Sequence, residues 1–450
     1  SPKAMPETTN LIAASAGAAG AGGSFGIEYS AAQAAQAAHP PGLTARRQWL
    51  LGAAALGAAA SPSMLWAGMV GTAGQGEVAA LPQRAAHPLA QWSPKGAATT
   101  TAESASGTAP ATSASPTTQP LSLQGPAIAP AQRAAYDRAF ASLPTQIAAQ
   151  SPDVQSLAVL HRGALAFEFY RPGVTADSLQ DVQSVTKSVL ALLFGCAMAD
   201  GLVRGPNELV ALRLPDLLRQ GGDSARLKKL RFGHLLTMTA GWPGEETARR
   251  DRDDDLRWLA RRPFIADPGA RFAYDNGAAN LLALALARTV GQPLASYART
   301  RLLQPLGITQ FNWRQGAQGH ALGALGLSIN TRAMARLGQL VLAGGAWQGR
   351  ALVPADYVAS ATQRQNAGGG PVFSPYGYLW WISADRPSRS SDRPAALASG
   401  YGGQWIYADP ARQCVVATTS RRTPESAARG QALALIRRQV LPALARLPGA

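Results

Sequence analysis

The segment from about Ser184 to Gly201 is almost entirely apolar after Lys187, and we expect it to form a helix. A helix that is apolar on every side has to be buried by other parts of the chain. The sequence therefore predicts a domain with a substantial core around this helix. One of the only five lysines in the chain lies in its first turn.

The material for that core lies in residues 126–450. The first 125 residues consist mainly of Ala, Gly, Ser, Thr and Pro and hold only one of the ten Tyr. The remainder has regular apolar runs and is long enough for one large domain. We expect an N-terminal extension at 1–80, a flexible Ser/Thr/Ala/Pro-rich linker at 81–125 and a folded domain at 126–450.

The N-terminal extension carries a candidate export signal. Arg46-Arg47 precedes a moderately apolar segment, which resembles a twin-arginine signal. No charge occurs between Arg47 and Glu77, so residues 49–72 could also span a bilayer as an uncleaved anchor. Arginines on the N-terminal side would keep that end in the cytoplasm. Cleavage and anchoring both remain open, and both predict a periplasmic or otherwise exported domain; a disordered tail with a chance Arg pair is the third reading.

The charge and the cysteines argue against several classes of function. The net charge is +16, almost all from Arg, but there is no run of five or six like charges and no basic helix stripe. A solvated surface is therefore favoured over nucleic-acid binding. The two cysteines, Cys196 and Cys414, lie in apolar runs and are expected to be buried free thiols; a disulfide between them in an oxidising compartment is the alternative. Without CxxC or HExxH we expect no metal and no other cofactor.

The order of elements predicts an α/β (α+β) fold. Strand-like runs occur near both ends of the folded part, and mostly helical patterns broken by Gly and Pro lie between them. This order favours one antiparallel sheet flanked by helices, built from both ends, with an inserted helical subdomain. The predicted elements are a helix at 130–148, strands at 156–160 and 164–170 joined by a tight turn, helices within 205–345, strands at 376–382, 396–408 and 414–420, and a helix at 424–445.

Ser184 and Lys187 form the only S-x-x-K motif in the chain, at the start of the apolar helix. Residues three apart share a helix face, so the amine can reach the hydroxyl. Serine is a weak nucleophile and needs a base beside it, and a lysine in a dry pocket can lose its proton near neutral pH. The motif therefore predicts a nucleophilic serine; the alternative is that Ser184 only caps the helix.

Tyr274 and Asn276 form the only Y-x-N motif, immediately before a second apolar helix at about 278–290. A loop there could bring the Tyr274 hydroxyl to Ser184 as a second proton carrier. Asn276 could offer its amide to a substrate carbonyl and also touch Lys187. The alternative is a packed Tyr with an Asn helix cap.

With these motifs the chain resembles the serine β-lactamase-related family over roughly 155–420. It is nearest to class C β-lactamases and to esterases and 6-aminohexanoate-dimer hydrolases of that fold. The further motifs that carry the resemblance are His234-Leu235-Leu236-Thr237-Met238-Thr239-Ala240-Gly241, Pro305-Leu306-Gly307, Gly326-Leu327 and Gly400-Tyr401-Gly402-Gly403-Gln404. It implies a β-lactamase/transpeptidase-like fold.

The resemblance also implies roles for the residues. Ser184 would form an acyl-enzyme, and Lys187 and Tyr274 would carry its protons. A strand at 401–404 would form the far wall of the site, with Tyr401, Gly402 and Gly403 in contact with substrate. The backbone N–H groups of Ser184 and Gln404 would form an oxyanion hole.

One departure from the family bears on the substrate. β-Lactamases and penicillin-binding proteins carry Lys-Thr-Gly or a close variant on that strand, and Tyr401-Gly402-Gly403 stands in its place here. The ammonium group of the lysine in Lys-Thr-Gly, which is missing here, would have bound a substrate carboxylate. We therefore expect an esterase or amidase for a less anionic small molecule. Asp275, between the two residues of the Y-x-N motif, is also unusual for the family.

Alternatives remain open. A class C-like β-lactamase, a D-amino-acid peptidase and a non-turnover sensor of β-lactams or cell wall all fit the motifs, whereas an α/β-hydrolase is excluded because the predicted folded domain, residues 126–450, has no G-x-S-x-G. His234 is expected to be structural, and Trp380, Trp381 and Trp405 are expected to pack in the core. The sequence specifies neither the substrate nor the oligomeric state.

Overall fold

A computed structural model describes residues 128–244, 254–384 and 393–448. The predicted extension at 1–80, with Arg46-Arg47 and the segment 49–72, and the predicted linker at 81–125 lie outside these ranges. None of the helices within them combines the length and the apolar character that crossing a membrane requires.

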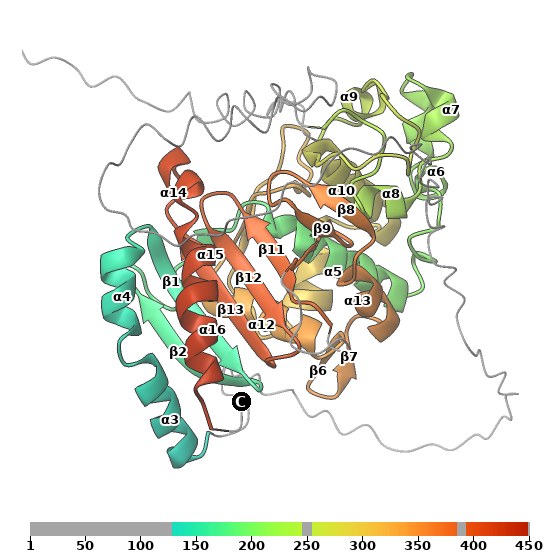
Figure 1. Cartoon of the computed structure of the whole chain (residues 1–450). Helices are drawn as coiled ribbons and strands as arrows, with labels where there is room; N and C mark the ends of the chain where they lie inside the picture. Colours follow the sequence, from blue (N-terminus) through green and yellow to red (C-terminus); the bar gives the residue numbers. More distant parts are fainter. Residues whose placement is uncertain (1–127, 245–253, 385–392, 449–450) are drawn as a thin grey trace, which may run out of the picture.

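An eight-stranded antiparallel sheet forms the centre of the domain (Figure 1). Its strand order is β2-β1-β13-β12-β11-β10-β9-β8, so strands from both ends of the domain meet at the β1–β13 pair. The predicted sheet built from both ends is therefore confirmed. Its strands are β1 (Val154–His161), β2 (Ala164–Tyr170), β8 (Asn366–Gly369), β9 (Ser374–Tyr376), β10 (Trp381–Ile382), β11 (Ala396–Gly400), β12 (Gln404–Asp409) and β13 (Cys414–Ser420).

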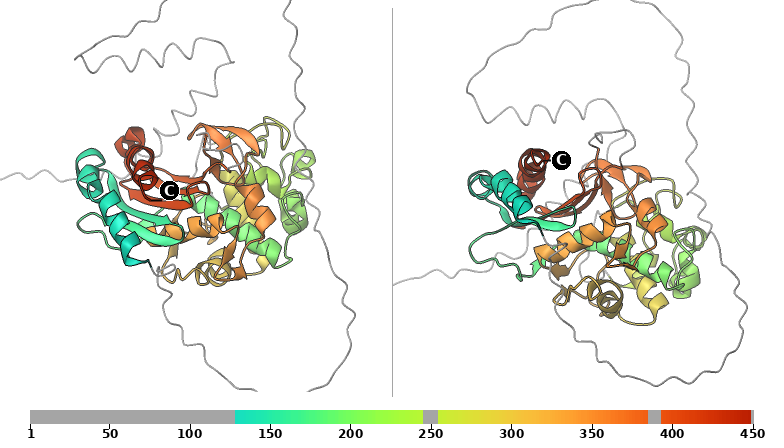
Figure 2. Two further views of the ribbon diagram at one scale, coloured as in Figure 1. Left: turned by 60° about the horizontal axis from the view of Figure 1, so that its bottom comes forward. Right: turned by 90° about the horizontal axis from the view of Figure 1, so that it is seen from below.

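Helices cover both faces of this sheet (Figure 2). One face carries α3 (Pro130–Phe140) and α4 (Leu143–Gln150) together with the C-terminal helices α14 (Pro424–Arg429), α15 (Gln431–Leu435), η3 (Ile436–Val440) and α16 (Leu441–Ala445). The other face carries α5 (Val185–Ala199) and α12 (Thr331–Leu342). Every residue of β13 is buried, as expected for a strand covered on both faces.

The predicted helical insertion lies between β2 and β8 in the chain. It packs beyond the sheet around α5 and α10, on the side where Figure 1 shows α6 to α9. Besides α5 and α12, its helices are α6 (Val210–Arg213), η1 (Pro215–Arg219), α7 (Ser224–Leu227), α8 (Phe232–Leu236), α9 (Leu256–Ala260), α10 (Asn276–Val290), α11 (Leu294–Ala298), η2 (Arg299–Leu303) and α13 (Ala355–Ala361). Short strands accompany them: β3 (Gln180–Asp181), β4 (Asn312–Trp313), β5 (Leu327–Ile329), β6 (Ala346–Trp347) and β7 (Arg350–Ala351).

Local sequence explains several boundaries. The β1–β2 hairpin turns at Arg162 and Gly163, both with positive φ, which matches the tight turn that the sequence predicts. The prediction of a single strand at 396–408 is wrong, because the structure has two strands there. Gly402 (φ 83°) and Gly403 (φ 107°) adopt left-handed backbone and reverse the chain, so β11 ends at Gly400 and β12 begins at Gln404.

Two long helices were also predicted where the structure has shorter ones. The helix at 130–148 is divided into α3 and α4, which has Pro144 in its first turn. The helix at 424–445 is interrupted after α14, where Gly430 is left-handed (φ 58°) and ends the helix.

The apolar helix α5 lies at the centre of the core. All residues from Val185 to Ala197 are buried, which confirms the burial predicted from its composition. Cys196 at its far end and Cys414 at the start of β13 are buried free thiols, as predicted. Burial raises the pKa of the Cys196 thiol to about 12, so this group stays protonated at neutral pH.

We predict that Gly338→Ala destabilises the domain by about 1–3 kcal/mol because it overpacks the core. Gly338 lies on α12, and a Cβ there would come within 2.5 Å of Val415 Cγ1 and 2.8 Å of Ile406 Cγ2. Urea unfolding of residues 126–450 measures the change. The sign of the change in the free energy of unfolding tests the prediction. Helix propensity alone would give the opposite sign, because Ala in place of a mid-helix Gly stabilises by about 0.5–1 kcal/mol.

Candidate functional site

Ser184 lies at the N-terminus of α5, at the end of a short connection from β3. Strand β3 pairs with β5, and Val182 N donates to Leu327 O at 2.9 Å. Gln183, just before the serine, has φ 52°, a left-handed conformation that is strained for a residue with a side chain. Asp181 Oδ1 accepts from Gln183 N at 2.9 Å and supports this turn. The result is a half-buried Ser184 at the start of the central helix.

Lys187 is one turn further along α5 and is 1% exposed. Its Nζ donates to Ser184 Oγ at 2.9 Å, to Asn276 Oδ1 at 2.6 Å and to the backbone oxygen of Ala324 at 2.8 Å. An ammonium group has three hydrogens, and each has an acceptor here. In the neutral form, two N–H groups satisfy Asn276 and Ala324, and the lone pair is left for the Ser184 hydroxyl. This is the geometry that a general base for Ser184 requires.

Tyr274 and Asn276 reach the same place from the start of α10. The Tyr274 ring lies 4.8 Å from Lys187 Nζ and stacks on Trp381, with ring centroids 5.6 Å apart. The structure thus brings together the four residues of the two motifs, although they lie up to 92 positions apart in the chain. The predicted contact between Asn276 and Lys187 is confirmed, and the role of Tyr274 as a proton carrier stays a prediction.

The segment predicted to form the far wall lies next to the connection that leads to Ser184, but part of it is a turn. A Cβ on Gly400 would lie 2.3 Å from Val182 O and 3.2 Å from the Gln183 Cβ, so the end of β11 packs directly against the connection to Ser184. Tyr401, Gly402 and Gly403 form the β11–β12 turn rather than a strand.

This turn leaves room for only one side chain. A Cβ at Gly402 would lie 2.6 Å from Arg421 O, and one at Gly403 would lie 2.8 Å from Ser420 Oγ. Tyr401 is therefore the one residue of the three whose side chain the turn can accommodate.

The side chain of Gln404 has a structural role. It is 1% exposed; its Nε2 donates to Ser420 O at 2.9 Å, and its Oε1 accepts from Ser420 N at 3.1 Å. These bonds join the start of β12 to the end of β13 behind the turn. The predicted oxyanion role of the Gln404 and Ser184 backbone N–H groups stays a prediction.

Asp275 faces away from Lys187. Its Oδ1 accepts from Gly277 N at 2.8 Å and caps α10, and both carboxylate oxygens accept from Arg262 Nη1, at 2.9 and 2.7 Å. The unusual residue within the Y-x-N motif is thus a helix cap in a buried ion pair.

Two supporting groups were missed in the sequence. The Ala324 carbonyl that binds Lys187 is held in place by Asn280, whose Oδ1 accepts from Ala324 N at 3.0 Å. A buried Asn one turn after Asn276, in an otherwise apolar helix, is the signal that could have identified this contact. The pairing of Arg262 with Asp275 had no comparable signal, because it depends on how α9 packs on α10.

His234 behaves as predicted. Its Nδ1 accepts from Arg231 N at 3.2 Å, and burial, followed by the nearby Arg231 charge, lowers its pKa to about 4. The imidazole is therefore neutral at neutral pH and holds the start of α8. Trp380 and Trp381 are 1% and 2% exposed and pack in the core as expected, although Trp381 also supports Tyr274.

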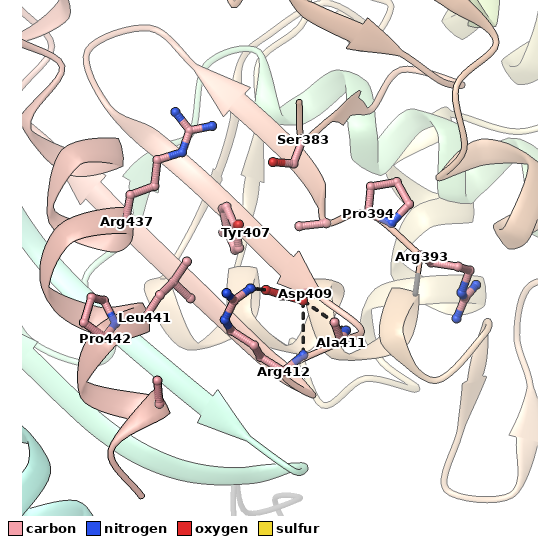
Figure 3. A pocket seen from close by; sticks show the side chains of 12 residues that line it. Ser383, Arg393, Pro394, Tyr407, Asp409, Ala411, Arg412, Arg437, Leu441 and Pro442 are labelled. Carbon is pink, nitrogen blue, oxygen red and sulfur yellow. Dashed lines mark hydrogen bonds and ion pairs between the residues drawn. The ribbon is translucent and has the colours of Figure 1, made fainter. Parts of the chain in front are cut away.

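A cavity of about 440 Å³ lies away from these residues, between β12 and the C-terminal helices (Figure 3). Its lining includes Ala395, just before β11, whereas Ser184 lies beside Gly400 at the other end of that strand. Arg412 in its wall is paired with Asp409 at 2.7 Å. None of the predicted site residues lines it, so it forms no part of the candidate active site.

Comparisons with known proteins agree with this geometry. The family model named Beta-lactamase matches residues 145–441. An Escherichia coli (strain K12) protein named "Putative D-alanyl-D-alanine carboxypeptidase" is 27% identical over 174 residues, which is 35% of this chain and 40% of that protein. The match thus spans less than half of that relative's length.

Solved structures share the fold. A "Putative 6-aminohexanoate-dimer hydrolase from Bacillus anthracis" superimposes with a TM-score of 0.56 at 19% identity, covering 68% of this chain and 82% of the other. A family VIII carboxylesterase gives a TM-score of 0.54 at 16% identity, covering 69% and 98%. The match of the family model over most of the described residues, together with the β-lactamase/transpeptidase-like fold, shows that this chain belongs to the beta-lactamase family.

Proposed function

We propose that this protein is an exported serine hydrolase that cleaves ester or amide bonds of small molecules through an acyl-enzyme on Ser184. The observation that carries the proposal is the buried Lys187 amine, 2.9 Å from Ser184 Oγ and fixed by two further oxygen acceptors. Lys187 takes the proton as Ser184 Oγ attacks the substrate carbonyl. Lys187 and Tyr274 then deliver a proton to the leaving group and activate the water that releases the acyl group.

The start of α5 favours the charge that develops in this reaction. The N-terminus of a helix carries a partial positive charge, and Ser184 lies there. Backbone N–H groups of Ser184 and Gln404 would stabilise the oxyanion, which is usually the largest electrostatic contribution in acyl transfer.

The substrate side of the site supports a neutral substrate. Tyr401, in the turn at 401–403, stands at the sequence position where β-lactamases carry the lysine of Lys-Thr-Gly. Arg422, which follows β13, is paired with Asp181 at 2.8 Å, so this nearby positive charge is already offset. An esterase or amidase similar to 6-aminohexanoate-dimer hydrolases is therefore our first candidate.

The second candidate is a peptidase or β-lactamase, including a form that is acylated without turnover. It is favoured by the Escherichia coli relative with a D-alanyl-D-alanine carboxypeptidase name. The two candidates differ in whether an anionic substrate acylates Ser184 efficiently.

We predict that Ser184→Ala abolishes turnover of a short-chain p-nitrophenyl ester, a loss of about 10³-fold or more, because the nucleophile is removed. Ser188→Ala is the matched control: Ser188 lies one turn further along α5, is buried, and donates to Leu379 O at 2.6 Å. It should retain activity. Intact-mass detection should show an acyl adduct in the wild type and in Ser188→Ala only. Equal turnover in Ser184→Ala and wild type would exclude Ser184 as the nucleophile.

We predict that Tyr401→Lys raises the rate of acylation by a chromogenic cephalosporin relative to a neutral ester by about 10-fold, because one added favourable charge contact contributes on the order of 1–2 kcal/mol. Tyr401→Gln removes the ring without adding charge and should leave the ratio close to wild type. Single-turnover acylation with both substrates measures it. Fast cephalosporin acylation in the wild type would support the second candidate instead.

We further predict that replacing Arg46-Arg47 by Lys-Lys prevents export, since twin-arginine signals are read through the arginine pair. Fractionation of a bacterial host that expresses residues 1–450 measures the share of ester hydrolase activity outside the cytoplasm. If the Lys-Lys variant is exported as well as the wild type, the twin-arginine assignment is wrong.

A further inference from the structure

The middle residue of the Y-x-N motif points in the opposite direction from its neighbours. Asp275 has extended backbone (φ −147°, ψ 118°), and consecutive side chains alternate in extended chain. Tyr274 and Asn276 therefore face Lys187, at 4.8 Å from ring centroid to Nζ and 2.6 Å from Oδ1 to Nζ, while Asp275 faces Arg262. The direction of one carboxylate thus sets the direction of two site residues.

Arg262 holds that carboxylate inside the protein. Its Nη1 donates to both Asp275 oxygens, and the side chains of the pair are 10% and 3% exposed. Asp275 Oδ1 also accepts from Gly277 N and caps α10. The same pair therefore fixes the start of α10 and the side chain immediately before it.

Two indole rings fix the guanidinium in turn. Arg262 Cζ lies 4.7 Å from the centroid of Trp242 and 5.5 Å from that of Trp258. Arginine stacks well on aromatic faces, which leaves its planar N–H groups free to bind a carboxylate. We call Trp242, Arg262 and Trp258 the arginine clamp.

The chain also leaves space for this clamp at the helix start. A Cβ on Gly277 would lie 2.0 Å from Arg262 Nη1, so the guanidinium packs against the first turn of α10. A cation near a helix N-terminus is unfavourable, and the Asp275 carboxylate between them compensates. Gly277 and Asp275 are thus both fitted to Arg262.

We propose that Arg262 is a positioning residue. Trp242 and Trp258 hold its guanidinium against Asp275, and Asp275 in turn aligns Tyr274 and Asn276 on Lys187 and Ser184. This inference rests on the proposed function, since the residues that it positions are those of the acyl-enzyme chemistry. It assigns a role in catalysis to a side chain that contacts neither the nucleophile nor its base. A displacement of about 1 Å at Asn276 would loosen the Lys187 amine and slow proton transfer.

The experiment compares Arg262→Lys with Arg301→Gln in the full chain. Arg262→Lys keeps the charge but loses the planar guanidinium that stacks on Trp242 and Trp258 and places Nη1 on both Asp275 oxygens. Arg301→Gln breaks a partly exposed ion pair between Arg301 and Asp200. Asp200 lies at the C-terminal end of α5, whereas Ser184 lies at its N-terminal end. For each variant we would measure kcat and KM for the p-nitrophenyl ester, the pH profile of kcat/KM and the thermal midpoint.

We expect Arg262→Lys to lower kcat by about 10- to 100-fold with KM changed much less, and to move the pH profile, because the contact of Asn276 with Lys187 is altered. Arg301→Gln should lower the thermal midpoint and leave kcat and the pH profile unchanged. Gly277→Ala is the second variant: it displaces the guanidinium without changing either partner of the pair, and it should reproduce the fall in kcat even if Arg262→Lys folds poorly.

Wild-type kcat and pH profile in both Arg262→Lys and Gly277→Ala would overturn the inference. The result for Ser184→Ala in the same assay separates the two proposals. If that variant is inactive while the clamp variants are normal, only the positioning role is wrong. If it is active, the proposed function itself fails.

Discussion

The rest of the site depends on the three hydrogen bonds of the buried Lys187 amine. A lysine that is 1% exposed needs acceptors for its hydrogens, and the fold supplies a hydroxyl from α5, an amide oxygen from α10 and a backbone oxygen at Ala324. Each acceptor comes from a different part of the chain. The requirement to satisfy one buried polar group therefore ties the central helix to the helical insertion and to the segment that precedes β5.

The surrounding structure keeps these acceptors in place through further buried polar contacts. Asn280 holds the backbone at Ala324, and Asp275 caps α10 beneath Asn276. On the other side, the end of β11 packs on the connection to Ser184 so tightly that Gly400 has no room for a Cβ. In the reaction that we propose, such support matters because proton transfer falls off steeply when donor and acceptor move apart. A central sheet covered on both faces provides the rigid frame for this arrangement.

Much of the site could be predicted from the sequence. The S-x-x-K spacing places Lys187 on the same helix face as Ser184, and the apolar run after it indicates burial, so both positions follow from local periodicity. The antiparallel sheet built from both ends followed from the order of strand and helix patterns. Local reasoning failed at 401–403, where the two glycines make a turn, because a run of apolar residues on both sides looks like one continuous strand.

The sequence by itself determined the pairing of Ser184 with Lys187 and the class of fold, because these depend on residue type and spacing along the chain. Tertiary structure alone decided what surrounds them: the Ala324 carbonyl on Lys187, the Arg262 partner of Asp275 and the closeness of Gly400 to Val182. A backbone carbonyl has no signature in the sequence, and an arginine on α9's C-terminal side meets α10 only through packing. Contacts between elements distant in the chain are set by how their surfaces fit, and that fit exists only once the domain has folded.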